Sequence, residues 1–136
     1  MDCIFCKIIQ KEIPSYTVYE DEFVLAILDI SQSTKGHTLV IPKNHVKNLY
    51  ELDSDSAGKI FERIPMLSRA IKNAFNPIGL NVLINTDKPL QSVYHFHIHL
   101  IPRYEKDTVL MNFDNNFGNT SKEEYLERMH QIQKYL

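Results

Sequence analysis

The chain has 136 residues, which is the size of one domain with its own hydrophobic core. Fifteen Lys and Arg residues against seventeen Asp and Glu residues give a formal charge of −2, so the chain offers no basic surface for a nucleic acid polymer. It contains no apolar run of about 18 residues that could span a membrane, and charge interrupts the N-terminus too early for a signal peptide. We therefore expect a soluble, cytoplasmic protein with no membrane and no nucleic acid polymer among its partners.

The first part of the sequence predicts a short helix followed by three strands. Residues 3–12 carry apolar side chains at helical spacing, and Pro14 ends this helix because it disfavours helical backbone at the residue before it. Residues 16–20 and 23–30 are rich in β-branched and aromatic side chains on either side of a polar pair, which predicts a hairpin. Residues 37–42 form an apolar segment that closes with a proline, as strands commonly do.

The rest of the sequence predicts two further strands between two amphipathic helices. Asp53 is a candidate N-cap for a helix over residues 54–75, whose apolar stripe is typical of a helix that lies on a sheet. Residues 80–85 and 95–102 predict two strands that turn residues join into an antiparallel pair. A long loop without a clean period follows, and the Ser-x-x-Glu pattern of a capping box opens a terminal helix over residues 121–136. This order predicts one domain of the α+β class, in which helices cover an antiparallel sheet.

Three histidines alternate with apolar residues in the segment HFHIHL. His95, His97 and His99 share one face of the predicted strand, and Phe96 and Ile98 between them point into the core. Each imidazole loses hydration when it is buried, and neighbouring imidazoles would repel one another if all were charged. Clustering them gains nothing for stability, so the pattern predicts a functional site.

The residues alone leave two interpretations of this cluster open. Imidazoles two residues apart could share a catalytic metal that keeps a position for water, although the first and third lie roughly 13 Å apart on a strand, too far to share one zinc ion. Alternatively, one imidazole is a nucleophile toward phosphorus, because neutral imidazole is nucleophilic at about pH 7 and its phosphorylated form is labile to water. Both interpretations place the chemistry on this strand.

The segment HFHIHLI matches the signature His-φ-His-φ-His-φ-φ of the histidine-triad family, where φ is an apolar residue. The segments CIFCKII, IPS, LDI, GHTLVIPKNH, GLNVLIN and QSVYHFHIHLIPR also resemble blocks of that family, in the family's order. The resemblance covers roughly residues 3–103 and is strongest for the Hint-type branch of nucleotide hydrolases and transferases. It implies a HIT-like fold with an antiparallel sheet of about five strands, a long helix, a helix near each end, and a homodimer with one continuous sheet.

This resemblance implies a role for each residue of a nucleotide site. His97 would attack the α-phosphorus and become nucleotidylated, and His99, His37 and Ser92 would contact the phosphate oxygens or the leaving group. Asp29 would accept hydrogen bonds from the ribose hydroxyls. The substrate would be a purine nucleotide that contains adenosine or guanosine monophosphate, in a nucleoside phosphoramidate, an acyl nucleotide or a dinucleoside polyphosphate. The remaining implied contacts are apolar residues around the nucleoside and two polar residues at the phosphate end: Phe5, Ile8, Ile27, Ile30 and Leu39, and Asn85 and Gln91.

The same resemblance implies a structural zinc ion. In the zinc-bearing branch of the family, two N-terminal cysteines, the histidine after the IPK segment and the first histidine of the triad form the site, which here are Cys3, Cys6, His45 and His95. Two thiolates and two imidazoles complete a tetrahedral zinc site and leave no position for a substrate. The spacing of the cysteines alone leaves open the alternative that both are ordinary buried thiols.

Two other functions stay open beside nucleotide hydrolysis or nucleotidyl transfer. A nucleotide-binding adaptor with negligible turnover would keep the pocket and the zinc and act through binding, whereas a metallohydrolase would hold a metal in the open site. The retained His97 argues for turnover. The segment NTDKPLQS, which contains Asn85 and Gln91, is one residue shorter than in many members of the family and lacks their glycine, so the leaving group stays open.

Overall fold

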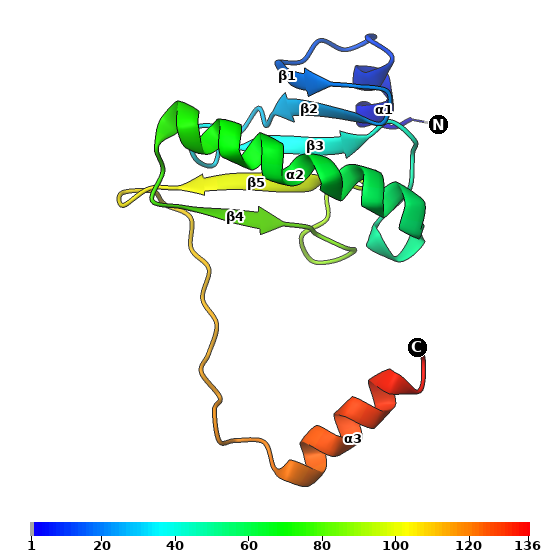
Figure 1. Cartoon of the computed structure of the whole chain (residues 1–136), viewed down its shortest axis with the longest axis vertical. Coiled ribbons are helices and arrows are strands. Elements are labelled where there is room, and N and C mark those ends of the chain that lie inside the picture. The colour runs from blue at the N-terminus through cyan, green and yellow to red at the C-terminus, as the bar shows by residue number, and fades with distance from the viewer. Residues whose placement is uncertain (1) are drawn as a thin grey trace.

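The chain folds around one five-stranded antiparallel sheet. The structure, a computed structural model, describes residues 2–136. The described elements, in chain order, are α1 (Ile4–Ile9), β1 (Thr17–Glu20), β2 (Val24–Leu28), β3 (Thr38–Pro42), the 3₁₀ helix η1 (Leu49–Glu51), α2 (Ser54–Phe75), β4 (Gly79–Leu83), β5 (Ile98–Arg103) and α3 (Lys122–Gln133). The strands lie in the order β1-β2-β3-β5-β4, and every neighbouring pair is antiparallel. Figure 1 shows α2 across the front of this sheet and α3 well away from it.

Helix α2 covers one face of the sheet with the apolar stripe that its sequence predicts. Asp53 caps it by accepting a hydrogen bond from the Ser56 backbone N–H at 2.8 Å, and Asn76 ends it in a left-handed conformation with φ of 47°. Within residues 2–136, neither α2 nor any other helix is long and apolar enough to cross a bilayer. The stripe packs on alternate residues of β2, β3 and the segment of residues 95–100: Ile60, Ile64, Leu67 and Ile71 against Val24, Ala26, Val40, Phe96, Ile98 and Leu100.

The opposite face of the sheet carries α1 and the histidines. Residues of β2 and β3 that alternate with those under α2 pack here against α1, so both strands are buried on both faces and read as unbroken apolar runs. Because α1 has only six residues, it covers part of this face and leaves space for a cavity beside it. The packed set is Leu25, Ile27, Leu39 and Ile41 against Cys3, Phe5 and Ile8.

The structure confirms the α+β class, the hairpin of β1 and β2, and strands β3 and β4. The predicted strand over residues 95–102 is wrong at its start, because β5 begins at Ile98 and only His99 of the three histidines lies in it. The backbone N–H of Phe96 donates to Val46 O at 2.8 Å, so this part of the chain bonds to the loop after β3 instead of to β3 itself. Side chains still alternate, with Phe96 and Ile98 in the core, and the predicted common face of the histidines is confirmed.

The C-terminal arm, residues 104–136, extends away from the sheet (Figure 1). Residues 104–120 are mostly irregular, as predicted, and lead into α3. The predicted capping box is present, since Ser121 and Glu124 each bond the other's backbone. No residue of α3 is buried, so the expectation that helices cover the sheet is wrong for this helix.

Within residues 2–136, the hydrogen bonds that hold the arm to the rest of the chain lie where it leaves β5. The Arg103 guanidinium donates to both carboxylate oxygens of Asp107, at 2.9 and 3.0 Å, and to Val109 O at 2.9 Å. The Tyr104 hydroxyl donates to Lys35 O at 2.7 Å. These bonds set the direction in which the arm departs from the sheet.

Candidate active site and metal centre

The three histidines separate into two environments on the α1 face of the sheet. The Phe5 ring packs edge-on against His95 and His97, with centroid distances of 5.9 and 4.9 Å, and the ring centroids of His97 and His99 are 4.9 Å apart. His95 is fully buried beside the N-terminal cysteines, whereas His97 and His99 line a cavity. One short stretch of backbone therefore serves two sites.

The first site is the cluster of Cys3, Cys6, His45 and His95, whose ligand atoms all lie within 4.8 Å of one another. Cys3 Sγ lies 3.4 Å from His95 Nδ1. Cys6 Sγ lies 3.4 Å from His45 Nδ1 and 3.6 Å from His95 Nδ1, and the two Nδ1 atoms are 3.0 Å apart. A tetrahedral zinc ion separates a sulfur and a nitrogen ligand by about 3.6 Å and two nitrogen ligands by about 3.3 Å. These residues therefore fit a four-coordinate zinc ion.

Hydrogen bonding turns one particular nitrogen of His95 toward this cluster. His95 Nε2 lies 2.8 Å from Pro42 O, and a carbonyl oxygen only accepts, so the proton sits on Nε2 and the Nδ1 lone pair faces the thiols. Burial lowers the pKa of His95, which favours the neutral imidazole that metal ligation requires. Burial, and then the neighbouring Cys3, raise the pKa of the Cys6 thiol, so a bound metal would displace its proton. Four protein ligands would leave no open position for a substrate.

The second site is a cavity of about 300 Å³ bounded by α1, the chain that follows it, β2, β3 and residues 92–99. Four of the predicted polar residues line it: Asp29, Ser92, His97 and His99. All five predicted apolar contacts also line it: Phe5, Ile8, Ile27, Ile30 and Leu39. The remaining lining residues were not assigned by the sequence analysis: Ile4, Ile13, Pro14, Ser15, Tyr16, Leu28 and Val93. The IPS segment was part of the family pattern, and that was the one signal that could have identified the wall after α1.

A backbone carbonyl sets the tautomer of His97. Its Nδ1 lies 2.7 Å from His95 O, so the ring proton sits on Nδ1 and the lone pair on Nε2. This Nε2 has no hydrogen-bond partner within residues 2–136. Every buried side-chain nitrogen and oxygen described there has a partner, so the unpartnered Nε2 is not buried and is accessible from the cavity that His97 lines. Burial lowers the pKa of His97, which keeps the ring neutral. His97 thus presents a neutral, oriented lone pair.

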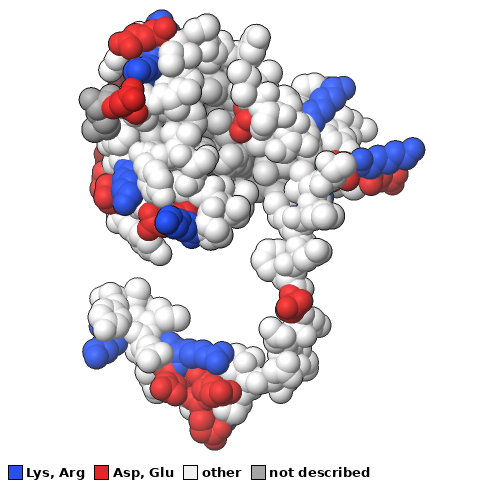
Figure 2. Space-filling model, turned by 180° about the vertical axis from the view of Figure 1, so that it is seen from behind, with Lys and Arg blue, Asp and Glu red and all other residues white. Residues whose placement is uncertain are grey.

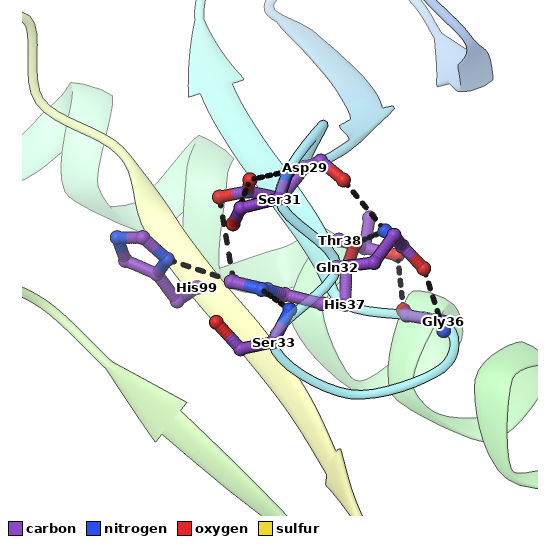
Figure 3. Close-up of polar contacts among 8 residues, drawn as sticks. All are labelled: Asp29, Ser31, Gln32, Ser33, Gly36, His37, Thr38 and His99. Atoms are coloured by element: carbon purple, nitrogen blue, oxygen red, sulfur yellow. Dashed lines mark hydrogen bonds and ion pairs between the residues drawn. The ribbon is translucent and has the colours of Figure 1, made fainter. Parts of the chain in front are cut away.

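A chain of hydrogen bonds sets the opposite tautomer in His99 (Figure 3). The Ser33 backbone N–H donates to His37 Nδ1 at 3.3 Å, so neutral His37 carries its proton on Nε2. That N–H donates to His99 Nδ1 at 2.9 Å, so neutral His99 carries its proton on its own Nε2. His37 stands behind His99 and does not line the cavity. Two neighbouring rings that line the cavity therefore differ in tautomer, with a lone pair on Nε2 of His97 and an N–H donor on Nε2 of His99.

Asp29 supplies the negative charge of this site. Its Oδ1 accepts from the backbone N–H and the hydroxyl of Ser31, at 2.8 and 2.7 Å, while Oδ2 lies 3.6 Å from His37 Nε2 (Figure 3). Burial acts to raise the pKa of Asp29, but the hydrogen bonds from Ser31 outweigh it and the net pKa is lowered. Burial lowers the pKa of His37, and burial with the charges of His97 and His37 lowers the pKa of His99 to about 4. The site therefore holds one carboxylate among neutral imidazoles at about pH 7.

Besides His37, two more predicted substrate contacts, Asn85 and Gln91, lie outside the cavity lining. Gln91 is buried, and its Oε1 accepts from the Asp87 backbone N–H at 2.7 Å. Its Nε2 donates to Lys47 O at 2.9 Å and to Val93 O at 3.2 Å, so this side chain ties the loop before it to two neighbouring segments. Asn85 is half-buried and also lies outside the lining. The assignment of both residues as substrate contacts stays a prediction.

Sequence comparison finds named relatives in a bacterium, a plant and a yeast. Protein hit of Bacillus subtilis is 59% identical over 106 residues, which cover 77% of this chain and 73% of that protein. Adenylylsulfatase HINT3 of Arabidopsis thaliana is 40% identical over 78% of this chain and 54% of that protein. Adenosine 5'-monophosphoramidase hnt1 of Schizosaccharomyces pombe is 41% identical over 76% of this chain and 75% of that protein.

Solved structures share the whole architecture. The crystal structure of a HIT family protein from Bacillus subtilis superposes with a TM-score of 0.97 at 49% identity, over 100% of this chain and 98% of that one. A crystal structure of a HIT family protein from Bacillus anthracis gives 0.95 at 46% identity, over 99% and 97%. A zinc-bound histidine triad family protein from Mycobacterium smegmatis gives 0.75 at 32% identity, over 100% and 99%. The profile of the HIT domain matches residues 10–106, which contain every described strand, and the chain therefore belongs to the HIT domain family.

Proposed function

We propose that this protein is a nucleotide-binding hydrolase or nucleotidyl transferase that works through a covalent nucleotidyl-His97 intermediate. The observation that carries the proposal is the pairing of His97 and His99 on one cavity, where one ring offers a lone pair and the other an N–H donor. Phosphoryl transfer asks a protein mainly to position phosphorus and to neutralise its oxygens. The apolar lining suits a nucleoside base, which leaves the phosphate for the histidines.

The proposed reaction has two steps. The Nε2 lone pair of His97 attacks the α-phosphorus and the bond to the leaving group breaks, while His99 Nε2–H binds a phosphate oxygen. Water then attacks phosphorus and releases a proton, the phosphorus–nitrogen bond breaks, and Nε2 recovers its lone pair as nucleoside monophosphate forms. Ser92, which lines the cavity, donates to the leaving group or to the phosphate. His37 positions His99 by holding its donor tautomer.

The proposed substrate is a purine nucleotide. Asp29 accepts hydrogen bonds from the ribose hydroxyls, because its Oδ2 is not used by Ser31 and the residue lines the cavity. The relatives from S. pombe and A. thaliana are named for a phosphoramidase acting on adenosine 5'-monophosphate and for an adenylylsulfatase. Both names support an adenosine nucleotide, with guanosine as the alternative base.

A structural zinc ion and a homodimer complete the proposal. The fit of Cys3, Cys6, His45 and His95 to tetrahedral ligation supports zinc, as does the zinc-bound relative from M. smegmatis. Strand β4 has a free edge within residues 2–136. If the β4 strands of two copies paired about a two-fold axis, the β4 edge of each copy would be covered and one sheet would extend across both copies.

The deciding experiment is a quenched reaction with an adenosine phosphoramidate, followed by mass spectrometry of the protein. We expect an adduct heavier by one adenylyl group that maps to His97. An acyl adenylate and a dinucleoside polyphosphate under the same conditions would rank the leaving groups. Binding of AMP without product from any of the three substrates would contradict the hydrolase and support an adaptor with negligible turnover.

A second candidate function, a metallohydrolase, rests on Asp29, His37 and His99, whose ligand atoms also lie within 4.8 Å of one another. A metal there needs lone pairs on His37 Nε2 and His99 Nδ1, the two atoms that otherwise share a hydrogen bond. About one zinc per chain, with activity that survives brief chelation, supports the nucleophile. About two metals per chain, with immediate loss of activity on chelation and no adduct, supports the metallohydrolase.

A further inference from the structure

The apolar side of α3 is uncovered. This α3 apolar face consists of Tyr125, Leu126, Met129, Ile132 and the nearby Leu136, and its exposed fractions run from 41% at Leu126 to 96% at Leu136. The other side of the helix is polar. An isolated helix of 12 residues is marginally stable in water, and an apolar stripe of this kind is a packing surface. The helix therefore requires a partner surface.

The sheet and helices of the same chain do not provide that surface. Within residues 2–136, no hydrogen bond or ion pair joins residues 110–136 to the sheet, to α1 or to α2, and no residue of α3 is buried. Figure 2 shows open space between the rest of the molecule and α3. The exposed apolar side chains of the linker add to the uncovered surface: Leu110, Phe113 and Phe117.

The arm nevertheless occupies the same place in two crystal structures. The arm is about a quarter of the chain, so a superposition that misplaced it could not reach TM-scores of 0.97 and 0.95 over 100% and 99% of the chain. An extended linker and a helix that do not contact their own sheet keep one position only if another surface holds them. Both crystal structures are of a HIT family protein alone, with no other protein named, which favours a second copy of the same chain as that surface.

We propose that the C-terminal arm is exchanged between two copies of the chain, so that the α3 apolar face of each copy packs on the body of the other. The arm leaves β5 beside the free edge of β4, and the space between β4 and α3 in Figure 1 lies on the side where a second copy paired along β4 would sit. The exposed side chains of Ile78 and Val82, next to and within β4, belong to the surface that such a copy covers. Exchange is reciprocal because a two-fold axis relates both arms. The inference rests on the homodimer proposed above.

The first test is photo-crosslinking of the full chain. The photoreactive residue benzoylphenylalanine replaces Met129 on the apolar face in one variant and Gln131 on the polar face in its control. We expect irradiation at low micromolar concentration to give a covalent dimer with the probe at 129 and far less with the probe at 131. Crosslinks from 129 to the sheet or to α2 of the same chain, at monomer mass, would overturn the proposal, as would equal yields from both positions.

The second test compares two variants that add one negative charge each to α3. Met129→Asp places the charge on the apolar face and should raise the dimer dissociation constant at least tenfold in sedimentation, because it buries a carboxylate at the proposed contact. Gln131→Asp places it on the polar face and should leave that constant unchanged. Since no residue of α3 is buried in its own chain, both variants should still show a cooperative unfolding transition of the domain, which thermal unfolding checks.

The outcomes separate this inference from the proposed function. A dimer that Met129→Asp does not weaken, or a wild-type protein that is monomeric at micromolar concentration, would overturn arm exchange. Neither result would alter the expected adenylyl adduct on His97, which is measured separately. Absence of the adduct from a dimer that Met129→Asp dissociates would contradict the hydrolase and leave arm exchange supported.

Discussion

His95 and His97 are two residues apart, yet their neutral rings adopt opposite tautomers. His95 donates from Nε2 to the Pro42 carbonyl and turns its Nδ1 lone pair toward two thiols. His97 donates from Nδ1 to the His95 carbonyl and leaves its Nε2 lone pair to the cavity. The residue type is the same, so the carbonyl that each ring meets decides which nitrogen is available. The neighbours of that nitrogen, thiols or an apolar wall, then decide whether it suits a metal or a phosphorus atom.

The largest effect should come from replacing the His97 ring. His97→Asn should lower kcat by about 10³-fold or more, because it removes the attacking atom, while AMP binding changes by less than about threefold. The mutant should also keep its zinc and its unfolding temperature. Steady-state kinetics and calorimetric titration with AMP measure both quantities. If His97→Asn retained substantial turnover, the nucleophile would lie elsewhere.

Replacing a ligand of the metal centre should instead lower the stability of the protein. Cys6→Ser should reduce the zinc content from about one per chain to near zero and lower the free energy of unfolding by about 4 kcal/mol when zinc is in large excess over its dissociation constant. Well below the unfolding temperature, kcat should stay within about tenfold, since the Cys6 side chain lies outside the cavity lining. Elemental analysis, thermal unfolding and kinetics test this. Lost activity with unchanged stability would instead indicate a catalytic metal.

Asp29 should distinguish the nucleoside end of the cavity from the phosphate end. Asp29→Asn should lower kcat/KM for a ribonucleotide substrate by about tenfold, because a charged acceptor for two hydroxyls becomes a neutral amide. The matched 2′-deoxy substrate, which offers one hydroxyl fewer, should lose less. Kinetics with both substrates on both proteins form a double-mutant cycle. Equal losses for the two substrates would contradict a contact with the 2′-hydroxyl.

The smallest expected effect is a dependence of stability on pH from His99. Its folded-state pKa of about 4 lies below the ordinary value of 6.5, so the unfolded chain binds this proton more readily. The His99 contribution to stability is therefore complete above pH 6.5 and is lost as pH falls toward 4. Unfolding temperatures of wild type and His99→Gln, measured across this range, should differ most at neutral pH and converge in acid. A gap that widened in acid would reverse the assigned direction.

Patterns of period two and of helical spacing predicted most of the fold. The alternation of His95, Phe96 and His97 placed each side chain on the correct face, because successive side chains of extended backbone point to opposite faces. Asp53 marked the start of α2 for a similarly local reason, as an N-cap bonds within its own turn. The nine cavity residues on the predicted list followed from the family resemblance and not from any local pattern.

The features that the sequence did not predict depend on distant partners. The start of β5 is decided by the bond from Phe96 to Val46, and the tautomer of His99 by His37, across 62 positions of sequence. Gln91 was expected to contact substrate, but its amide is occupied by three backbone groups of the loops around it. The stripe of α3 predicted an amphipathic helix correctly, yet a stripe does not indicate which surface covers it.

Because side chains alternate between two faces from His95 to Leu100, the function of this segment depends on its exact number of residues. Deleting one residue within it would reverse the face of every side chain on one side of the deletion. An imidazole would then enter the core under α2, and Phe96 or Ile98 would enter a site built for phosphate or metal. A substitution within the segment therefore affects one of these parts at a time, whereas insertions and deletions would remove the core, the metal centre and the nucleophile together.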